Sequence, residues 1–298
     1  MLGDGQLNLR HEVAMAGSVL SVVETGQGLP VLLGHGFLWD WRMWQPQLRV
    51  LSSRCRVIVP ELWGHGGSGP LPHGTRTLAD LARHMVELLD RLEIGRCVVI
   101  GSSVGGMWGA HLAARAPERV AGLVLMNSHL GEEPWATRLT YTAMLDQIDA
   151  AGRVSEELVA AITPLFFAPD IEQRLPALPD RLRQQIHGFD AQALRRSIVP
   201  LGRMIFGRTD ALSLLPDVVA PTLVIAGEHD RARPLEESHT MAEILQTELV
   251  TIPGCGHTAT LERPDAVNAA LLRFLDRLGW GTALEAAAES RARAGTWW

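Results

Sequence analysis

The stretch CVVIGSSVGGMWGAHLAARAP (97–117) decides the fold. It begins with a β-branched run typical of a strand buried on both faces, and it ends in a helical segment that Pro117 stops. Between the two lies Gly101-Ser102-Ser103-Val104-Gly105, which matches G-x-S-x-G with Ser103 at the centre. A nucleophile on a sharp strand-to-helix turn is held in strained backbone geometry, and the flanking glycines leave room for that turn. The stretch therefore predicts a strand–turn–helix unit that presents Ser103 as a nucleophile.

Outward from this unit, short apolar strands alternate with helices, which predicts an α/β fold with a mostly parallel central sheet and flanking helices. Further strands are expected at 19–25, 30–34, 55–60, 120–127, 222–227 and 248–253. One helix should follow a capping box formed by Thr77 and Asp80, and the last should begin at Pro264.

The rhythm of strands breaks from residue 130 to 215, where the sequence predicts helices only, among them 137–151 and 155–167. We therefore expect an α/β core built from residues 1–129 and 216–281, with a helical insertion at 130–215. Residues 282–298 form an alanine-rich polar tail of no assigned role.

The composition excludes several classes of function. The 298 residues are 47% hydrophobic and 20% charged, as in folded soluble proteins, and they contain no apolar run of membrane-spanning length. The net charge is −6 without a basic stripe, so neither nucleic acid nor an anionic membrane is expected as a partner. Because the chain contains no lysine, Schiff-base chemistry, pyridoxal phosphate chemistry and a P-loop are excluded.

The cysteines and the N-terminus bear on the compartment. Cys55, Cys97 and Cys255 are odd in number and far apart, which argues against a disulfide framework. The N-terminal residues lack a basic segment followed by an apolar one, so no secretory signal is expected. A reducing cytoplasm is the predicted location.

Two further residues complete a catalytic constellation with Ser103. Asp230 follows the expected strand 222–227, and His257 follows the expected strand 248–253. The carboxyl ends of parallel strands meet at one edge of a sheet, so the three side chains should converge there. His257 would then accept the proton of Ser103, and Asp230 would hold the imidazole tautomer. Glu228 is a competitor for the acid, but the position after strand 120–127 has no carboxylate until Glu132.

The order along the chain is nucleophile, acid, histidine, which is the order that the α/β-hydrolase fold enzymes use. Residues 17–280 resemble that family. Two other motifs carry the same resemblance: His35-Gly36-Phe37 is similar to the family's HGx loop, and Glu61-x-x-Gly64-x-Gly66-x-Ser68 is similar to its D-x-x-G-x-G-x-S turn, with glutamate replacing aspartate. The resemblance implies an oxyanion hole formed by the N–H groups of Phe37 and Val104. It also implies that the helical insertion, which falls between the sixth and seventh strands, caps the active site.

These features predict a serine hydrolase that cleaves a carboxylic ester or lactone of a small, mostly apolar substrate through an acyl-enzyme. No cofactor and no metal are expected, because no cluster of side chains has metal-ligand spacing. Carbon–carbon bond hydrolysis and cofactor-free perhydrolysis use the same triad and remain alternatives, as does a small-molecule receptor of the same fold.

Candidate pocket residues lie beside the expected turns and in the insertion: Trp39, His129, Trp135 and Tyr141. Arginines and acidic residues are nearly balanced over 129–215, which gives no signal for a strongly anionic substrate.

Overall fold

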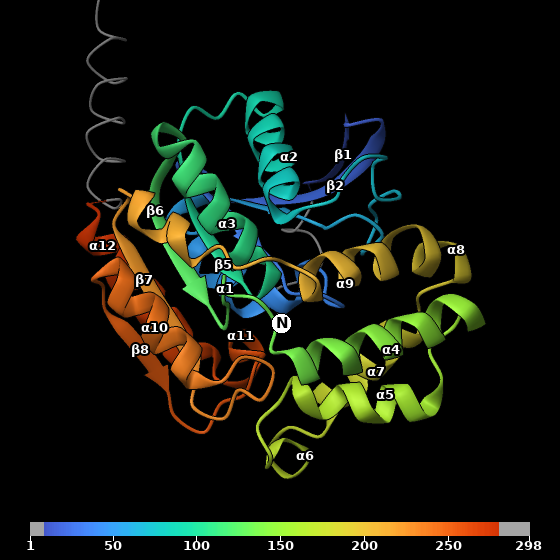
Figure 1. The fold of residues 1–298 in the computed structure, drawn as a ribbon. Helices are drawn as coiled ribbons and strands as arrows, with labels where there is room; N and C mark the ends of the chain where they lie inside the picture. Colours follow the sequence, from blue (N-terminus) through green and yellow to red (C-terminus); the bar gives the residue numbers. More distant parts are fainter. Residues whose placement is uncertain (1–8, 280–298) are drawn as a thin grey trace, which may run out of the picture.

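One eight-stranded sheet organises the computed structural model, which describes residues 9–279 (Figure 1). The strand order is β1-β2-β4-β3-β5-β6-β7-β8; β1, β2 and β4 pair antiparallel, and all other neighbours pair parallel. The strands are β1 (Leu9–Met15), β2 (Ser18–Thr25), β3 (Leu29–Gly34), β4 (Cys55–Pro60), β5 (Cys97–Ser102), β6 (Val120–Met126), β7 (Thr222–Gly227) and β8 (Leu249–Ile252). The predicted mostly parallel sheet is confirmed, and the tail at 282–298 lies outside the described residues.

Strand β1 is the one strand that the sequence did not predict. It pairs with β2 through a tight turn at Ala16 and Gly17, whose φ angles of 50° and 76° are those of a type I′ hairpin. The strand forms the edge of the sheet, and its Arg10 forms an ion pair with the fully buried Glu61 at the end of β4. An edge strand needs only a weak apolar pattern, so its sequence carries little signal.

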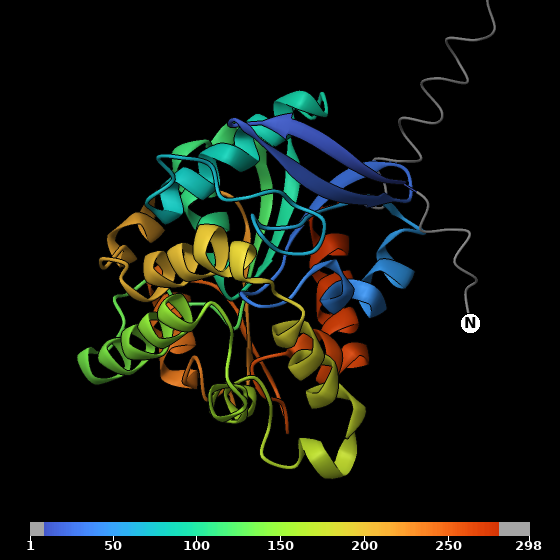
Figure 2. The same ribbon diagram turned by 90° about the vertical axis from the view of Figure 1, so that its right-hand side faces the viewer.

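Helices cover both faces of the sheet. On one face α2 (Leu78–Arg91) packs against α3 (Val104–Arg115), and α10 (Leu235–Leu245) packs against β7; on the other, α1 (Gln45–Leu51) packs against α12 (Pro264–Arg277) (Figures 1 and 2). The predicted capping box of Thr77 and Asp80 is present at the start of α2, and α12 begins at Pro264 as predicted. The short helix α11 (Ala259–Glu262) precedes α12.

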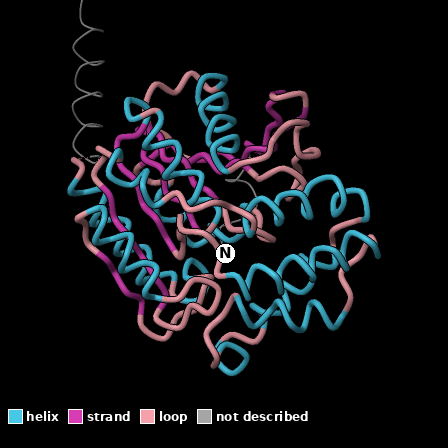
Figure 3. Tube along the Cα trace, viewed as in Figure 1, coloured by secondary structure: helices cyan, strands magenta, loops and turns pink. Residues whose placement is uncertain are grey.

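Between β6 and β7 the chain forms helices and no strand (Figure 3). The helices are α4 (Trp135–Ala151), α5 (Glu156–Ile162), α6 (Ile171–Arg174), α7 (Ala177–His187), α8 (Ala191–Ala193) and α9 (Val199–Phe206). They lie to one side of the sheet and its covering helices (Figure 1). We call residues 130–215 the helical segment. No helix in the described part of the chain is long and apolar enough to cross a membrane.

Candidate active site

Ser103 lies in the turn between β5 and α3, where the backbone is strained as the sequence predicts. Its φ and ψ are 53° and −120°, which a non-glycine residue rarely adopts. A side chain at Gly101 would place its Cβ 2.2 Å from the carbonyl oxygen of Gly105, and one at Gly105 would place it 2.1 Å from that of Gly34. Only glycines therefore allow the turn to approach its neighbours, and Ser103 is held at the N-terminus of α3.

Asp230 and His257 lie just past β7 and β8 and are joined by a hydrogen bond. The distance from His257 Nδ1 to Asp230 Oδ2 is 2.8 Å, and both side chains are buried. A carboxylate only accepts, so the proton lies on Nδ1 and Nε2 is left as an acceptor. Asp230 Oδ1 accepts from the backbone N–H groups of Ala232 and Arg233 at 2.9 and 2.8 Å. These bonds fix the carboxylate that orients the imidazole.

Asn127, directly after β6, is a site residue that the sequence analysis did not assign. Its Nδ2 donates to Asp230 Oδ2 at 2.8 Å, so this oxygen receives both the amide and the imidazole of His257. Asn127 has a φ of 48°, a left-handed conformation that asparagine tolerates better than most residues. Its position at the end of a parallel strand is the sequence signal for this role, because the side chains at neighbouring strand ends lie close together.

The N–H groups of Phe37 and Val104 are the predicted oxyanion donors. Val104 is the first residue of α3, where N–H groups have no partner within the helix. Within residues 9–279, neither N–H donates to another group of the protein. Both remain available to a negatively charged oxygen, and the N-terminus of a helix favours one.

Two buried histidines hold the loop that carries Phe37. His35 Nε2 accepts from the N–H of Leu62 at 2.7 Å, and His65 Nε2 accepts from the N–H of Leu38 at 3.2 Å. Burial lowers the pKa of His35, and burial followed by the proximity of the His35 ring lowers the pKa of His65 to about 3. Both rings therefore stay neutral and act as acceptors that position the loop.

Ser103 and His257 line one mostly apolar cavity of about 90 Å³. Its walls come from the loop after β3, from α3 and from four helices of the helical segment. Members include Phe37, Met107, Met144, Leu145, Ile162, Phe166, Ile198, Ile205 and Phe206. The predicted pocket residue Tyr141 lines this cavity and packs on Phe206 with ring centroids 4.5 Å apart. The other polar wall residues are Arg208 and Arg233.

Three predicted pocket residues, Trp39, His129 and Trp135, are not among those that line this cavity. Trp135 begins α4 with 71% of its surface exposed, because the first turn of this helix points into solvent. His129 is buried beside Arg208 and Arg233, and burial followed by these two charges lowers its pKa to about 4. Trp39 packs edge-on against Phe167 and borders a different groove.

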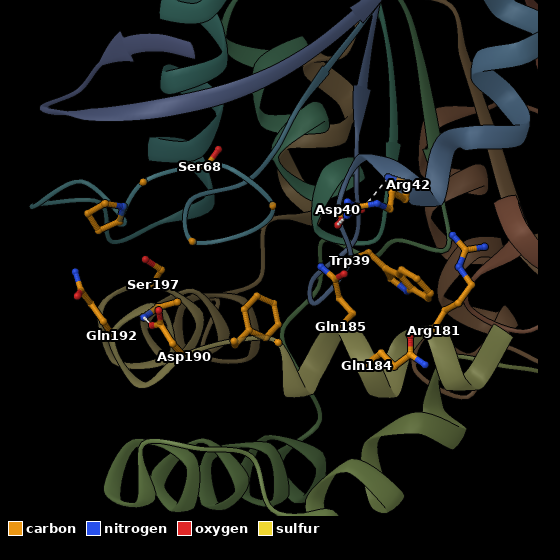
Figure 4. A pocket seen from close by; sticks show the side chains of 17 residues that line it. Trp39, Asp40, Arg42, Ser68, Arg181, Gln184, Gln185, Asp190, Gln192 and Ser197 are labelled. Carbon is orange, nitrogen blue, oxygen red and sulfur yellow. Dashed lines mark hydrogen bonds and ion pairs between the residues drawn. The ribbon is translucent and has the colours of Figure 1, made fainter. Parts of the chain in front are cut away.

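This second groove of about 690 Å³ separates the loop at 64–70 from α7 and α8 (Figure 4). Polar side chains dominate it, including Gln184 and Gln185 from α7 and Asp190, which caps the start of α8. Neither Ser103 nor His257 lines this groove. Its size alone does not make it a reaction site, because it lacks a nucleophile beside a base.

The possible metal ligands and the cysteines form no second reactive centre within residues 9–279. No group of His, Cys, Asp and Glu side chains within residues 9–279 is arranged to hold a metal ion. All three cysteines are free and buried. Burial raises the pKa of Cys97 to about 12, and it raises that of Cys255 as well, so neither thiol is activated.

Comparison with known proteins identifies the family. The family model described as "alpha/beta hydrolase fold" matches residues 30–264. A putative carbamate hydrolase RutD from Caulobacter sp. strain K31 is 31% identical over 252 residues, which cover 82% of this chain and 90% of that protein. A thermophilic esterase from Thermogutta terrifontis superposes with a TM-score of 0.80 at 29% identity, covering 91% of this chain and 99% of that one.

An enol-lactonase from Burkholderia xenovorans LB400 also superposes with a TM-score of 0.80, at 25% identity over 89% of this chain and all of that one. The chain belongs to the α/β-hydrolase fold family and resembles its esterases and lactonases. It is an α/β-hydrolase enzyme.

Proposed function

We propose that this enzyme is a serine hydrolase that cleaves a carboxylic ester or lactone of a small substrate. The observation that carries the proposal is the buried 2.8 Å hydrogen bond between His257 Nδ1 and Asp230 Oδ2, with Ser103 lining the same cavity as that histidine. The esterase and the enol-lactonase among the similar structures support the same class of substrate.

The reaction starts with attack by Ser103 Oγ on the carbonyl carbon, while His257 Nε2 accepts the hydroxyl proton. The oxyanion accepts from the N–H groups of Phe37 and Val104, and Asp230 stabilises the imidazolium. Collapse breaks the bond to the alcohol oxygen, which takes the proton from His257 and leaves an acyl-enzyme. Water then gives a proton to His257 and attacks the acyl carbon, and Ser103 leaves with that proton.

The helical segment supplies most of the apolar wall, so we propose that residues 130–215 form a cap over a core made of residues 1–129 and 216–281. An apolar cavity of about 90 Å³ favours a small acyl group, because larger ones must displace wall side chains. Met107 and Met144 are the flexible members of that wall.

Hydrolysis of p-nitrophenyl acetate, butyrate and octanoate by wild type and Ser103→Ala tests the proposal. We expect Ser103→Ala to lose activity by more than about 10³-fold. Ser102→Ala is the matched control, since Ser102 is also buried, at the end of β5, but does not occupy the motif centre. Undiminished turnover by Ser103→Ala overturns the proposal, and the chain-length profile measures the acyl site.

The alternatives give different results in the same assay. A receptor of this fold hydrolyses none of the esters and is not labelled by a fluorophosphonate. A carbon–carbon hydrolase is labelled on Ser103 but turns over these esters poorly. A perhydrolase hydrolyses them and forms peracid when hydrogen peroxide and a carboxylic acid are supplied.

A further inference from the structure

Two buried arginines open on the cavity that contains Ser103 and His257. Arg208 follows α9 and is 6% exposed, and Arg233 follows β7 and is 5% exposed. Apart from Tyr141 and the catalytic pair, the other residues of the lining are apolar. Two guanidinium groups in such a wall are costly unless their charge and donors are compensated.

The protein supplies both arginines with one shared carboxylate. Glu133, whose side chain is fully buried, accepts from Arg208 Nη1 at 2.8 Å through Oε2 and from Arg233 Nη2 through Oε1. Glu237 Oε2 lies 3.6 Å from Arg233 Nη1, which is too far for a hydrogen bond. Burial is the main cause that raises the pKa of the Glu237 carboxyl, and the charge of Glu237 in turn helps to raise the pKa of Arg233, so this carboxylate is a second counter-charge that leaves Nη1 without a hydrogen bond.

Three guanidinium nitrogens remain without an acceptor. Arg208 Nε and Nη2 and Arg233 Nη1 are buried and donate to no group within residues 9–279. Burial and then the charge of Arg233 lower the pKa of Arg208, and the charges of Glu133 and Glu237 only partly oppose this shift. Arginines and acidic residues are nearly balanced over residues 129–215 as a whole, and this count does not indicate that guanidinium donors outnumber their acceptors at the cavity. A planar guanidinium matches a carboxylate with two parallel hydrogen bonds.

We propose that Arg208 and Arg233 bind a carboxylate on the substrate, so that the enzyme acts on an ester or lactone that also carries a carboxylate group. This proposal rests on the proposed function and names its substrate class. The substrate carboxylate would accept hydrogen bonds from the unpaired guanidinium nitrogens, while the ester carbonyl lies at Ser103.

A purely structural role for the cluster gives a different result. Glu133 precedes α4, Arg208 follows α9 and Arg233 belongs to the core, so the cluster also ties the helical segment to the core. If this tie is its only role, removing an arginine lowers activity toward charged and neutral substrates equally. Binding of a carboxylate instead changes the ratio between the two.

The test compares mono-p-nitrophenyl esters of the linear dicarboxylic acids from glutaric to suberic acid with the same esters whose free carboxylate is replaced by a carboxamide. We expect wild type to prefer the acid over the amide for at least one length by about 10- to 100-fold in kcat/KM, as for hydrogen bonds to a charged group. Arg208→Met should remove this preference, mainly through KM for the acid. Arg208→Lys should retain a part of it.

Arg203→Met is the matched control, because Arg203 is an exposed arginine of α9 paired with Asp146 and Asp149. It should leave the ratio unchanged. The proposal is overturned if wild type shows no preference for the acid at any length, or if the preference survives in Arg208→Met. The ratio of kcat/KM between the acid and the amide is measured on wild type, so it tests the proposal even if a variant fails to fold. If no ester in the series is hydrolysed in a Ser103-dependent manner, the proposed function itself fails.

Discussion

Asn127 Nδ2 donates to Asp230 Oδ2 at 2.8 Å, the same oxygen that accepts from His257 Nδ1 at 2.8 Å. With the two backbone N–H groups that reach Oδ1, the carboxylate accepts four hydrogen bonds within a buried site. The acid after β7 is thus held in part by an amide from β6. Two neighbouring strand ends therefore cooperate to orient the histidine that lines the same cavity as Ser103.

Asn127→Gly should lower kcat by about 10-fold, since one charge-assisted hydrogen bond of about 1.5–3 kcal/mol is lost and only part of it acts in the transition state. Glycine also accepts the φ of 48° without strain. Asn127→Ala should lose as much activity and should also unfold at a lower urea concentration, because alanine is strained at the positive φ of position 127. Wild-type kcat in Asn127→Gly contradicts a positioning role.

Gly105→Ala should destabilise the fold by about 3 kcal/mol, as expected for a buried overpacked position. The new Cβ would lie 2.1 Å from the carbonyl oxygen of Gly34, and the backbone of β3 cannot yield because it pairs on both sides. Urea unfolding measures the loss. Gly95→Ala is the control, with nothing within 4 Å of its Cβ, and should change stability by less than about 0.5 kcal/mol. Equal midpoints for the two variants would refute the close approach.

Glu133→Gln should lower the free energy of unfolding by about 3 kcal/mol, because it removes the carboxylate that two buried guanidinium groups share. This loss is at the low end of what breaking a buried ion pair costs, because the glutamine side chain keeps one hydrogen-bond acceptor. Glu87→Gln removes the surface pair with Arg91 and should cost about 0.5 kcal/mol or less. If the two variants lose the same stability in urea, the cluster does not hold the helical segment to the core.

His65 should make stability depend on pH. Its pKa is about 3 in the folded chain against 6.5 when unfolded, so the unfolded state binds more protons between these values. Its contribution is complete above pH 6.5 and is lost as pH falls toward 3. The substitution His65→Gln removes this titration. The slope of the free energy of unfolding against pH should therefore become flatter between pH 6.5 and 4, by up to about 1.4 kcal/mol per pH unit. Urea melts at several pH values measure it, and an unchanged slope would show that His65 protonates in the folded state.

Much of the fold was predictable because its signals are local. The buried run before Ser103, the flanking glycines and the capping box at Thr77 each specify their own segment, and parallel pairing brings the strand ends together. Strand β1 was missed because an edge strand buries little apolar surface. The sequence also does not reveal which way a side chain at a helix start points, and the structure places Trp135 in an exposed position outside the lining of the cavity.

The site contacts that could not be predicted join segments that are distant in the sequence. Asn127 and Asp230 are 103 residues apart, and Glu133 and Arg233 are 100 apart, so no spacing in the sequence links them. Charge counted along a segment likewise gives no measure of which guanidinium nitrogens remain unpaired after packing.

The most direct test of the account is labelling by a fluorophosphonate followed by peptide mass mapping, in wild type, Ser103→Ala and His257→Ala. We predict a single adduct on Ser103, absent from Ser103→Ala and formed at least about 100-fold more slowly in His257→Ala, as general-base assistance requires. An adduct on another residue that accompanies loss of esterase activity, or esterase activity that persists in Ser103→Ala, would contradict the account.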